Sequence, residues 1–81
     1  MINAATSFIL YADCEVTYRG RAKSTLKRGK YLIIRKGDGC LLIHNKNKSI
    51  PQNYQAAGAT LIVDENKLIS TRRKETIEII L

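Results

Sequence analysis

Apolar and polar side chains alternate along the chain between Phe8 and Tyr18. The even positions hold the apolar and aromatic residues Phe8, Leu10, Ala12, Cys14, Val16 and Tyr18, and the odd positions include Asp13, Glu15 and Thr17. A period of two is typical of a β-strand with one buried face. Nowhere does the chain sustain the spacing of three and four that an ordinary amphipathic helix requires. The alternation therefore predicts an all-β fold with a long, half-buried first strand.

Further strands are expected where short apolar and β-branched runs stand between turn residues. These runs are residues 31–35, 40–44, 59–63, 68–71 and 76–81. Residues 36–39, Lys-Gly-Asp-Gly, should form a hairpin turn, because glycine and aspartate accept positive φ at little cost. Between Arg19 and Gly29 we expect a loop with at most one short helical turn, capped by Ser24. The sequence thus predicts about six antiparallel strands in a small barrel or sandwich.

The composition indicates one small globular domain over residues 1–81. Its 44% hydrophobic residues, five Gly and one Pro are typical of a folded chain. No apolar stretch approaches the roughly 20 residues of a membrane span, and the start lacks a charged signal-peptide region, so we expect a soluble cytoplasmic protein. Cys14 and Cys40, with the single histidine, cannot complete a four-ligand zinc site. We expect both cysteines to be buried in strands, with a bridge between them left open, and we expect no cofactor.

The positive charge is confined to the first part of the chain. Residues 1–48 hold ten Lys and Arg against three acids, and residues 49–81 hold four against four, so the formal charge of +7 comes from residues 1–48, whose cations all lie between Arg19 and Lys48. Such a charge attracts polyanions, and nucleic acid is the commonest of these in a cell. A membrane surface is disfavoured as partner, because the basic residues lie between strand-like segments and not on one helix face.

Two segments carry residues suited to nucleic acid. Residues 19–24 alternate long cations with small residues, so that a phosphate can approach the backbone while guanidinium groups fork onto its oxygens. Tyr54 stands among amides behind the only proline, and stacking a base on an aromatic face contributes about 1–3 kcal/mol. A solvated turn and a tyrosine that plugs the barrel end are the respective alternatives. The candidate DNA-binding residues are Arg19, Arg21, Lys23, Ser24, Lys46, Lys48, Asn53, Tyr54 and Gln55.

No residue pattern in the chain is typical of an active site. His44 stands alone at the end of an expected strand, where a structural role is commoner than catalysis. Glu75 and Glu78 lie beside the basic run 72–74, where charge compensation explains them. A magnesium-dependent nuclease would need several carboxylates that converge on one point. We therefore expect no catalysis, no metal and no small-molecule substrate.

The last expected strand is apolar on both faces. Ile77, Ile79 and Leu81 face one way and Ile80 the other. A bare apolar edge here would pair with another chain, so the protein either forms a homodimer through strands or is the front part of a longer protein. An oligomerisation or protein-interaction module with an incidental basic surface is thus the alternative to DNA binding.

Several motifs, in order, resemble the N-terminal domain of the archaeal and actinobacterial endonuclease NucS, also called the mismatch-specific endonuclease EndoMS. They are residues 14–24, 36–39, 42–44, 51–55 with Gly58, and 69–73, and they cover almost the whole chain from Tyr11 onward. The resemblance implies a half-open β-barrel or sandwich that dimerises, binds single-stranded or mispaired DNA and precedes a RecB-like nuclease domain. It also implies that Arg21 contacts DNA, that Tyr54 stacks a base and that Asn53 contacts an extruded base.

This chain departs from the family pattern at three points. Tyr54 replaces the tryptophan of the family, which implies weaker stacking because the ring is smaller. Ser49, with Lys48 beside it, stands where the family has an arginine. The nuclease motif, an Asp followed by Glu-x-Lys, does not occur in these residues, so the cleavage activity of the family is not carried over. The hypothesis is a homodimeric domain that holds single-stranded or locally unpaired DNA, alone or as the non-catalytic part of a nuclease.

Overall fold

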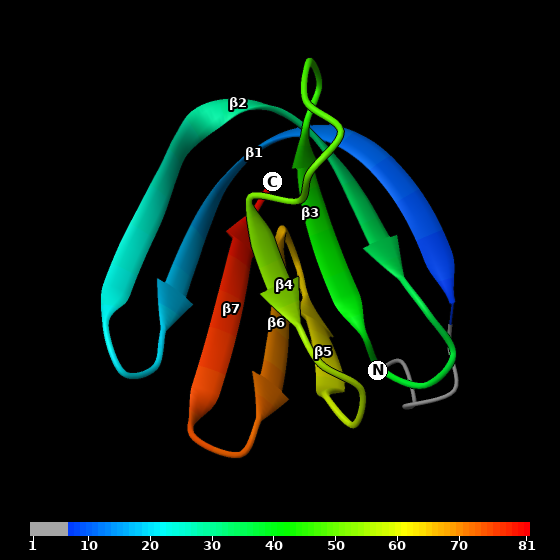
Figure 1. Cartoon of the computed structure of the whole chain (residues 1–81), viewed down its shortest axis with the longest axis vertical. Coiled ribbons are helices and arrows are strands. Elements are labelled where there is room, and N and C mark those ends of the chain that lie inside the picture. Colours follow the sequence, from blue (N-terminus) through cyan, green and yellow to red (C-terminus); the bar gives the residue numbers. More distant parts are fainter. Residues whose placement is uncertain (1–6) are drawn as a thin grey trace.

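The computed structural model describes residues 7–81, which form one curled antiparallel sheet (Figure 1). Its strands are β1 (Phe8–Arg19), β2 (Lys23–Arg35), β3 (Leu41–Asn45), β4 (Asn53–Gln55), β5 (Thr60–Asp64), β6 (Lys67–Arg72) and β7 (Glu75–Ile80). The spatial order is β4-β3-β2-β1-β7-β6-β5, so β4 and β5 are edges and the sheet does not close into a barrel. No helix occurs in the described residues. The all-β, half-open prediction is confirmed, with seven strands in place of about six.

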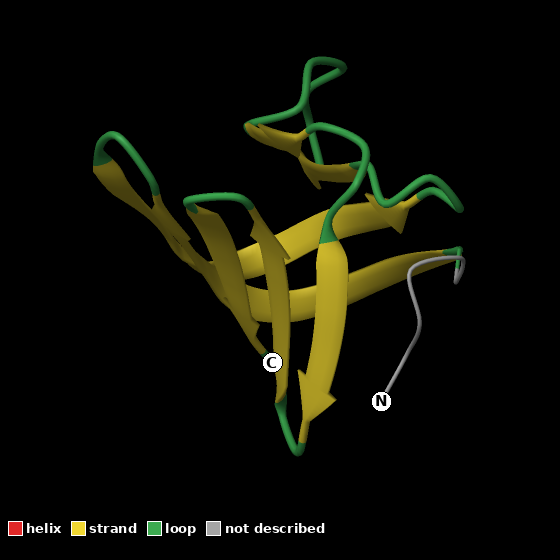
Figure 2. Ribbon diagram, turned by 90° about the horizontal axis from the view of Figure 1, so that it is seen from below, coloured by secondary structure: helices red, strands yellow, loops and turns green. Residues whose placement is uncertain are grey.

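β1 and β2 are long enough to serve both halves of the sheet. β3 pairs only with the second half of β2, from Tyr31 to Arg35, and β7 pairs only with the second half of β1, from Glu15 to Arg19. Between these regions the register shifts, because Cys14 lies opposite Gly29 whereas Val16 lies opposite Leu26. Such a bulge bends a strand and increases its twist. The bend turns the two halves of the sheet toward each other, and the strands in Figure 2 accordingly run in two different directions.

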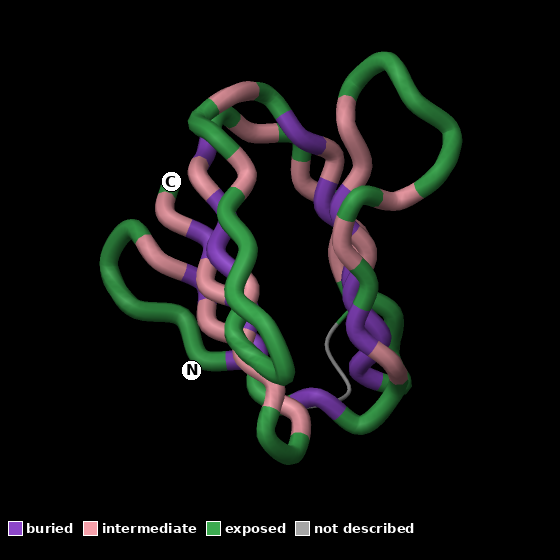
Figure 3. Tube along the Cα trace, turned by 60° about the vertical axis from the view of Figure 1, so that its left-hand side comes forward, coloured by how far each residue is buried: buried purple, intermediate pink, exposed green. Residues whose placement is uncertain are grey.

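The hydrophobic core lies between the two halves. Ile33 and Ile43 from one half, and Ile77 and Ile79 from the other, are among its most buried members. Figure 3 shows that buried residues follow the facing strands and that exposed residues follow the loops. Cys14 lies in this core, on β1 as expected, whereas the buried Cys40 lies just before β3, and both thiols are free. The bridge that the sequence left open is therefore not formed.

The predicted loop between Arg19 and Gly29 is wrong. β2 already begins at Lys23, and only Gly20–Ala22 connect it to β1. The second half of β1 extends beyond the bulge, and its backbone groups need partners that the first half of β2 supplies. Most side chains of that half are exposed on both faces. Without a buried face this segment carries no apolar alternation, and so no strand was predicted for it.

The predicted bare edge at the C-terminus is also wrong. β7 lies inside the sheet, with a ladder to β1 on one side and a ladder to β6 on the other. Ile77 and Ile79 fill the core, and Ile80 is half-buried on the opposite face. The apolar content of this strand therefore reflects its interior position, and it no longer supports dimerisation through a strand edge.

Candidate nucleic-acid interface

The β1–β2 hairpin carries four of the predicted DNA-binding residues at one end of the sheet. Arg19, Arg21, Lys23 and Ser24 are all exposed there. The turn is tight: the Gly20 amide donates to the Ala22 carbonyl at 3.0 Å. A side chain at residue 20 would meet the phenol ring of Tyr18, whose Cζ lies 2.8 Å from the site of a Cβ. Glycine therefore allows the Tyr18 ring to pack against the turn while the long cations project around it.

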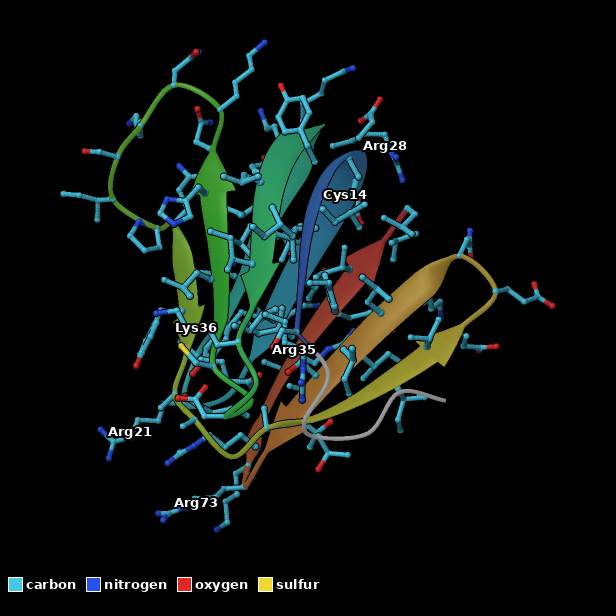
Figure 4. The ribbon with its side chains drawn as sticks, turned by 90° about the vertical axis from the view of Figure 1, so that its right-hand side faces the viewer. Cys14, Arg21, Arg28, Arg35, Lys36 and Arg73 are labelled. Carbon is cyan, nitrogen blue, oxygen red and sulfur yellow. The ribbon has the colours of Figure 1, made fainter. Side chains whose placement is uncertain are left out.

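A second cationic turn lies beside this hairpin. Arg73 and Lys74 form the two-residue connection between β6 and β7. Because β7 pairs with β1, with Thr76 opposite Arg19, the two turns are neighbours. The labelled Arg21 and Arg73 lie at the same end of the molecule and both extend away from it (Figure 4).

The two turns enclose a hollow of about 530 Å³, which we name the basic hollow. It is lined by Tyr18, Gly20, Arg21, Arg72, Arg73, Lys74 and Glu75. The lining holds four cations and one carboxylate. The Tyr18 hydroxyl donates a hydrogen bond to Glu75 Oε2 at 3.0 Å, and this bond raises the pKa of the Tyr18 hydroxyl above its ordinary value. The excess of positive charge makes the hollow suited to an anion.

The cations of the β6–β7 turn were not among the predicted binding residues. They were expected to be compensated by Glu75 and Glu78, but Glu78 pairs with Lys67 at 3.6 Å and Glu75 accepts from Tyr18. The signal was present as three successive cations at a predicted turn. Their position beside Arg21 depends on the pairing of β1 with β7, which the sequence did not indicate.

Tyr54 lies on the edge strand β4, and 59% of its surface is exposed. It does not plug the end of the barrel, which was the alternative for this residue. Cys40 raises the pKa of the Tyr54 hydroxyl, first through the charge of its thiolate form and then through a hydrogen bond, and Arg72 acts in the opposite direction. Gln55, the next residue of β4, donates from Nε2 to the carbonyl of Glu75 at 3.4 Å, so the edge strand that carries Tyr54 lies beside a residue of the basic hollow.

The two amides beside Tyr54 do not lie at the surface with it. Gln55 is fully buried: Ser70 Oγ donates to its Oε1 at 2.5 Å, and its Nε2 donates to the carbonyls of Ser70 at 3.3 Å and Glu75 at 3.4 Å. Asn53 is half-buried, and its Nδ2 is buried without a hydrogen-bond partner among the described residues. The Gln55 side chain links β4 to the opposite half of the sheet and is unavailable to a base in this conformation, which corrects its place among the expected contacts.

Replacing Gln55 with leucine should lower the free energy of unfolding by about 1–3 kcal/mol, because the buried Ser70 hydroxyl loses its acceptor. The same substitution at the exposed Gln52 is the matched control and should change it by less than about 0.5 kcal/mol. Adding Ser70→Ala to Gln55→Leu should cost less than the sum of the two single changes. Urea denaturation of the four variants measures these costs, and equal costs at residues 52 and 55 would contradict the structural role.

Lys46 and Lys48 lie apart from the basic hollow. Both are exposed in the connection between β3 and β4, where the Asn47 amide donates to Asn45 Oδ1 at 2.9 Å. This connection lies at the upper end of the view in Figure 1, whereas the β1–β2 and β6–β7 turns lie at the lower end. The structure therefore does not bring these lysines together with Arg21.

An apolar patch lies on the outer surface of the sheet, away from the core. Ile9 and Tyr11 of β1 are 73% and 54% exposed, and they pair with Ile34 and Leu32 of β2. We name these four residues the outer apolar face. Exposed apolar clusters of this kind are common at protein interfaces.

Two further expectations concern metals and membranes. Within residues 7–81 no group of three or more His, Cys, Asp or Glu could hold a metal ion. In the same part of the chain no helix is long and apolar enough to cross a membrane.

Comparison with known proteins gives concordant matches. Residues 5–80 match the family described as the endonuclease NucS N-terminal PH-like domain. Endonuclease NucS of Pyrococcus furiosus is 47% identical over 72 residues, a match that covers 86% of this chain and 27% of the relative. The chain thus spans about a quarter of the length of this relative.

Two solved structures share the fold. One is the complex of EndoMS with double-stranded DNA, with a TM-score of 0.83 and 43% identity over 96% of this chain and 35% of the other. The second is a repair endonuclease from Pyrococcus abyssi, with a TM-score of 0.84 and 34% identity over 96% of this chain and 36% of the other. At these identities the likeness extends beyond the fold to the sequence that builds it.

Proposed function

The chain belongs to the family of NucS N-terminal domains, and we propose that it is a DNA-binding domain that holds single-stranded or locally unpaired DNA. The observation that carries the proposal is the exposed ring of Tyr54 on the edge strand β4, which lies beside the basic hollow, since Gln55 of the same strand donates to the carbonyl of Glu75 in the hollow lining. The relative solved in complex with double-stranded DNA supports DNA as the partner.

Stacking on Tyr54 explains why unpaired DNA is preferred. A base inside a duplex is stacked on its neighbours and hides both faces, whereas an unpaired base can leave the stack at a cost of a few kcal/mol or less. An exposed aromatic ring then offers a face to any base. Arg19, Arg21, Lys23 and Ser24 would bind the phosphates on either side, because their exposed hairpin borders the basic hollow, which lies beside β4.

Fluorescence titration with labelled oligonucleotides tests the proposal. The panel contains a single strand, a perfect duplex, a duplex with one mismatch and a single-stranded RNA, each measured at several salt concentrations. Affinity for the single strand should fall with salt at a slope of about −0.7 per phosphate neutralised. Affinity that does not respond to salt would overturn the electrostatic part, and equal affinity for single strand and perfect duplex would overturn the preference for unpaired DNA.

The proposal includes a homodimer in which two copies of the outer apolar face pack together. The support is that the four side chains of this face are apolar or aromatic and that Ile9 is 73% exposed in the single chain. Ile9→Glu should shift sedimentation velocity toward the monomer, because the carboxylate would be buried without a partner at the interface. Ile62→Glu, at an exposed position of β5, is the control and should leave the dimer intact. If the unaltered protein is a monomer, the dimer is refuted but the proposal of DNA binding is not affected. If it is a dimer that does not bind DNA, the oligomerisation module is favoured.

We also propose that this domain holds DNA and does not cut it. The relatives named as endonucleases are about four times as long as the matched part, since the match covers 27% of one of them. The described residues offer no cluster of three metal ligands for a metal-dependent nuclease. Cleavage would then depend on a separate catalytic segment.

A further inference from the structure

We propose that the basic hollow is a phosphate-binding subsite for the DNA backbone, in which the β6–β7 turn residues Arg72, Arg73 and Lys74 act together with Arg21. This inference rests on the proposed function and adds residues that lie far from the β1–β2 hairpin in the sequence. It assigns the second cationic turn a direct role in binding, in place of charge compensation.

The first argument is the shape and charge of the hollow. Its volume of about 530 Å³ is well above that of a single phosphate group, so a phosphodiester with its flanking sugars can enter. Four cations face one carboxylate across it. Glu75 is engaged by the Tyr18 hydroxyl at 3.0 Å, which holds the carboxylate against the wall formed by the tyrosine ring. A phosphate in the hollow would therefore meet a net positive lining.

The second argument is the way in which Arg72 is held. Its Nε–H donates to the carbonyl of Ala57 at 2.8 Å, and this bond fixes the plane of the guanidinium group. The guanidinium has four further N–H donors on its two Nη atoms, in a geometry that matches phosphate oxygens. A fork fixed in advance loses less entropy on binding than a mobile side chain does. Arg72 thus combines the properties of a preorganised phosphate ligand.

The third argument is the backbone of the β6–β7 turn. Arg73 adopts a positive φ of 55°, which favours glycine or asparagine and strains a residue with a long side chain. A glycine here would relax the turn but remove a guanidinium from the hollow. The position therefore allows stability and DNA binding to be separated, because one substitution should move them in different directions.

The fourth argument is the relation of the hollow to Tyr54. Arg72 lines the hollow, and its Nε–H donates at 2.8 Å to the carbonyl of Ala57, in the segment that follows the strand of Tyr54. A strand with one base on Tyr54 would then have a neighbouring phosphate within reach of the hollow. The subsite thus gives the backbone a fixed point beside the stacked base.

The test compares two double variants that each remove two positive charges. The turn variant is Arg73→Gly with Lys74→Gln, and the matched control is Lys27→Gln with Arg28→Gln. Lys27 and Arg28 are exposed, and Arg28 lies at the end of the molecule opposite to Arg21 and Arg73 (Figure 4). Affinity for a single-stranded oligonucleotide is measured over a range of salt concentrations, and the melting temperature of each protein is measured in parallel.

The turn variant should bind about tenfold more weakly, with a salt slope that is shallower by about 1.4 because two cations are lost. The control should lose less than about threefold, because Arg28 lies at the opposite end of the molecule and is engaged there by Asp13 and by the Ile80 carbonyl, so that mainly the general attraction changes. Arg73→Gly alone should weaken binding without lowering the melting temperature, which a purely structural role would not produce. At constant ionic strength, inorganic phosphate should displace DNA from the unaltered protein more strongly than chloride does. This difference between the two anions should disappear in the turn variant.

Equal losses in the two double variants would overturn the subsite while leaving the proposed function in place. The subsite would also be overturned if the turn variant bound DNA with the same affinity and the same salt dependence as the unaltered protein. If the unaltered protein shows no binding to any oligonucleotide, the proposed function fails and the subsite fails with it. These outcomes are distinguishable because the unaltered protein is measured first.

Discussion

Replacing Gly39 with alanine should lower the free energy of unfolding by about 3 kcal/mol, because the substitution meets two separate obstacles. Gly39 has a positive φ of 93°, which residues with a Cβ rarely adopt. A Cβ at this position would also lie 2.7 Å from the amide nitrogen and 2.9 Å from the carbonyl oxygen of Ala59. Both contacts are to backbone, so no flexible side chain can move aside to relieve them.

The site of this close approach explains why a single methyl group has so large an effect. The turn between β2 and β3 packs there against the connection between β4 and β5. The Gly58 amide donates to the Asp38 carbonyl at 2.7 Å, and Arg35 Nη2 donates to the Ala59 carbonyl at 2.9 Å. Arg35 is 1% exposed, and this buried hydrogen bond ties the two halves of the sheet together. Moving the backbone of Ala59 would disturb these bonds as well.

Gly58→Ala provides the matched control. Gly58 has nearly the same φ, 98°, but nothing lies within 4 Å of the position that a Cβ would take. Its replacement should therefore cost only the backbone strain, about 1–2 kcal/mol. Urea denaturation measures the free energy of unfolding of both variants, and the difference between their losses is the cost of the steric contact with Ala59. If the two alanines prove equally destabilising, the close packing at Ala59 is not what requires glycine at residue 39.

The same contact positions the proposed DNA-binding surface. Asp38 Oδ1 accepts from the Cys40 amide at 2.9 Å, and Cys40 in turn lies close enough to Tyr54 to raise the pKa of its hydroxyl. Variants that loosen this turn should therefore weaken DNA binding indirectly, through the orientation of Tyr54. A loss of affinity in Gly39→Ala is accordingly evidence about the scaffold, and only substitutions that leave stability unchanged report on the binding residues themselves.

The parts of the fold that the sequence predicted are those with one buried face. β1 alternates from Phe8 to Tyr18 because its even positions line the core, and the turn at residues 36–39 carries at residue 39 the glycine that its positive φ favours. The first half of β2 has few buried side chains, so it carries no such pattern. The position of β7 between β1 and β6 depends on pairings across more than fifty residues, which no local pattern encodes.

In the candidate site, too, the features that local residue type reveals were predicted, and those that depend on strand pairing were not. The cationic hairpin and Tyr54 are recognisable from residue type alone, and the structure exposes both. Gln55 was expected at the surface because no strand was predicted at residues 53–55. In a strand the neighbours of an outward residue point inward, so once β4 is recognised, the burial of Gln55 follows. The basic hollow required the pairing of β1 with β7 and could not be found locally.

Replacing Tyr54 with alanine should weaken binding to single-stranded DNA by about 1–3 kcal/mol, roughly 5- to 150-fold, because a stacked base loses its platform. The change should not unfold the domain, since 59% of the side chain is exposed and lies outside the core. Fluorescence titration at one fixed salt concentration measures the loss, and the melting temperature checks the fold. Ile62→Ala, on the other edge strand and 47% exposed, is the control for loss of exposed apolar surface and should bind normally.

Two further substitutions at residue 54 separate stacking from other roles of the tyrosine. Phenylalanine keeps the ring and removes only the hydroxyl that interacts with Cys40, so affinity should change by less than about threefold. Tryptophan offers a larger face, so affinity should rise above that of the unaltered protein. The order Trp, Tyr, Phe, Ala follows from ring area, whereas a role through the hydroxyl would place Phe and Ala together. An affinity that is the same in all four proteins would remove Tyr54 from the interface and leave DNA binding to the cationic turns alone.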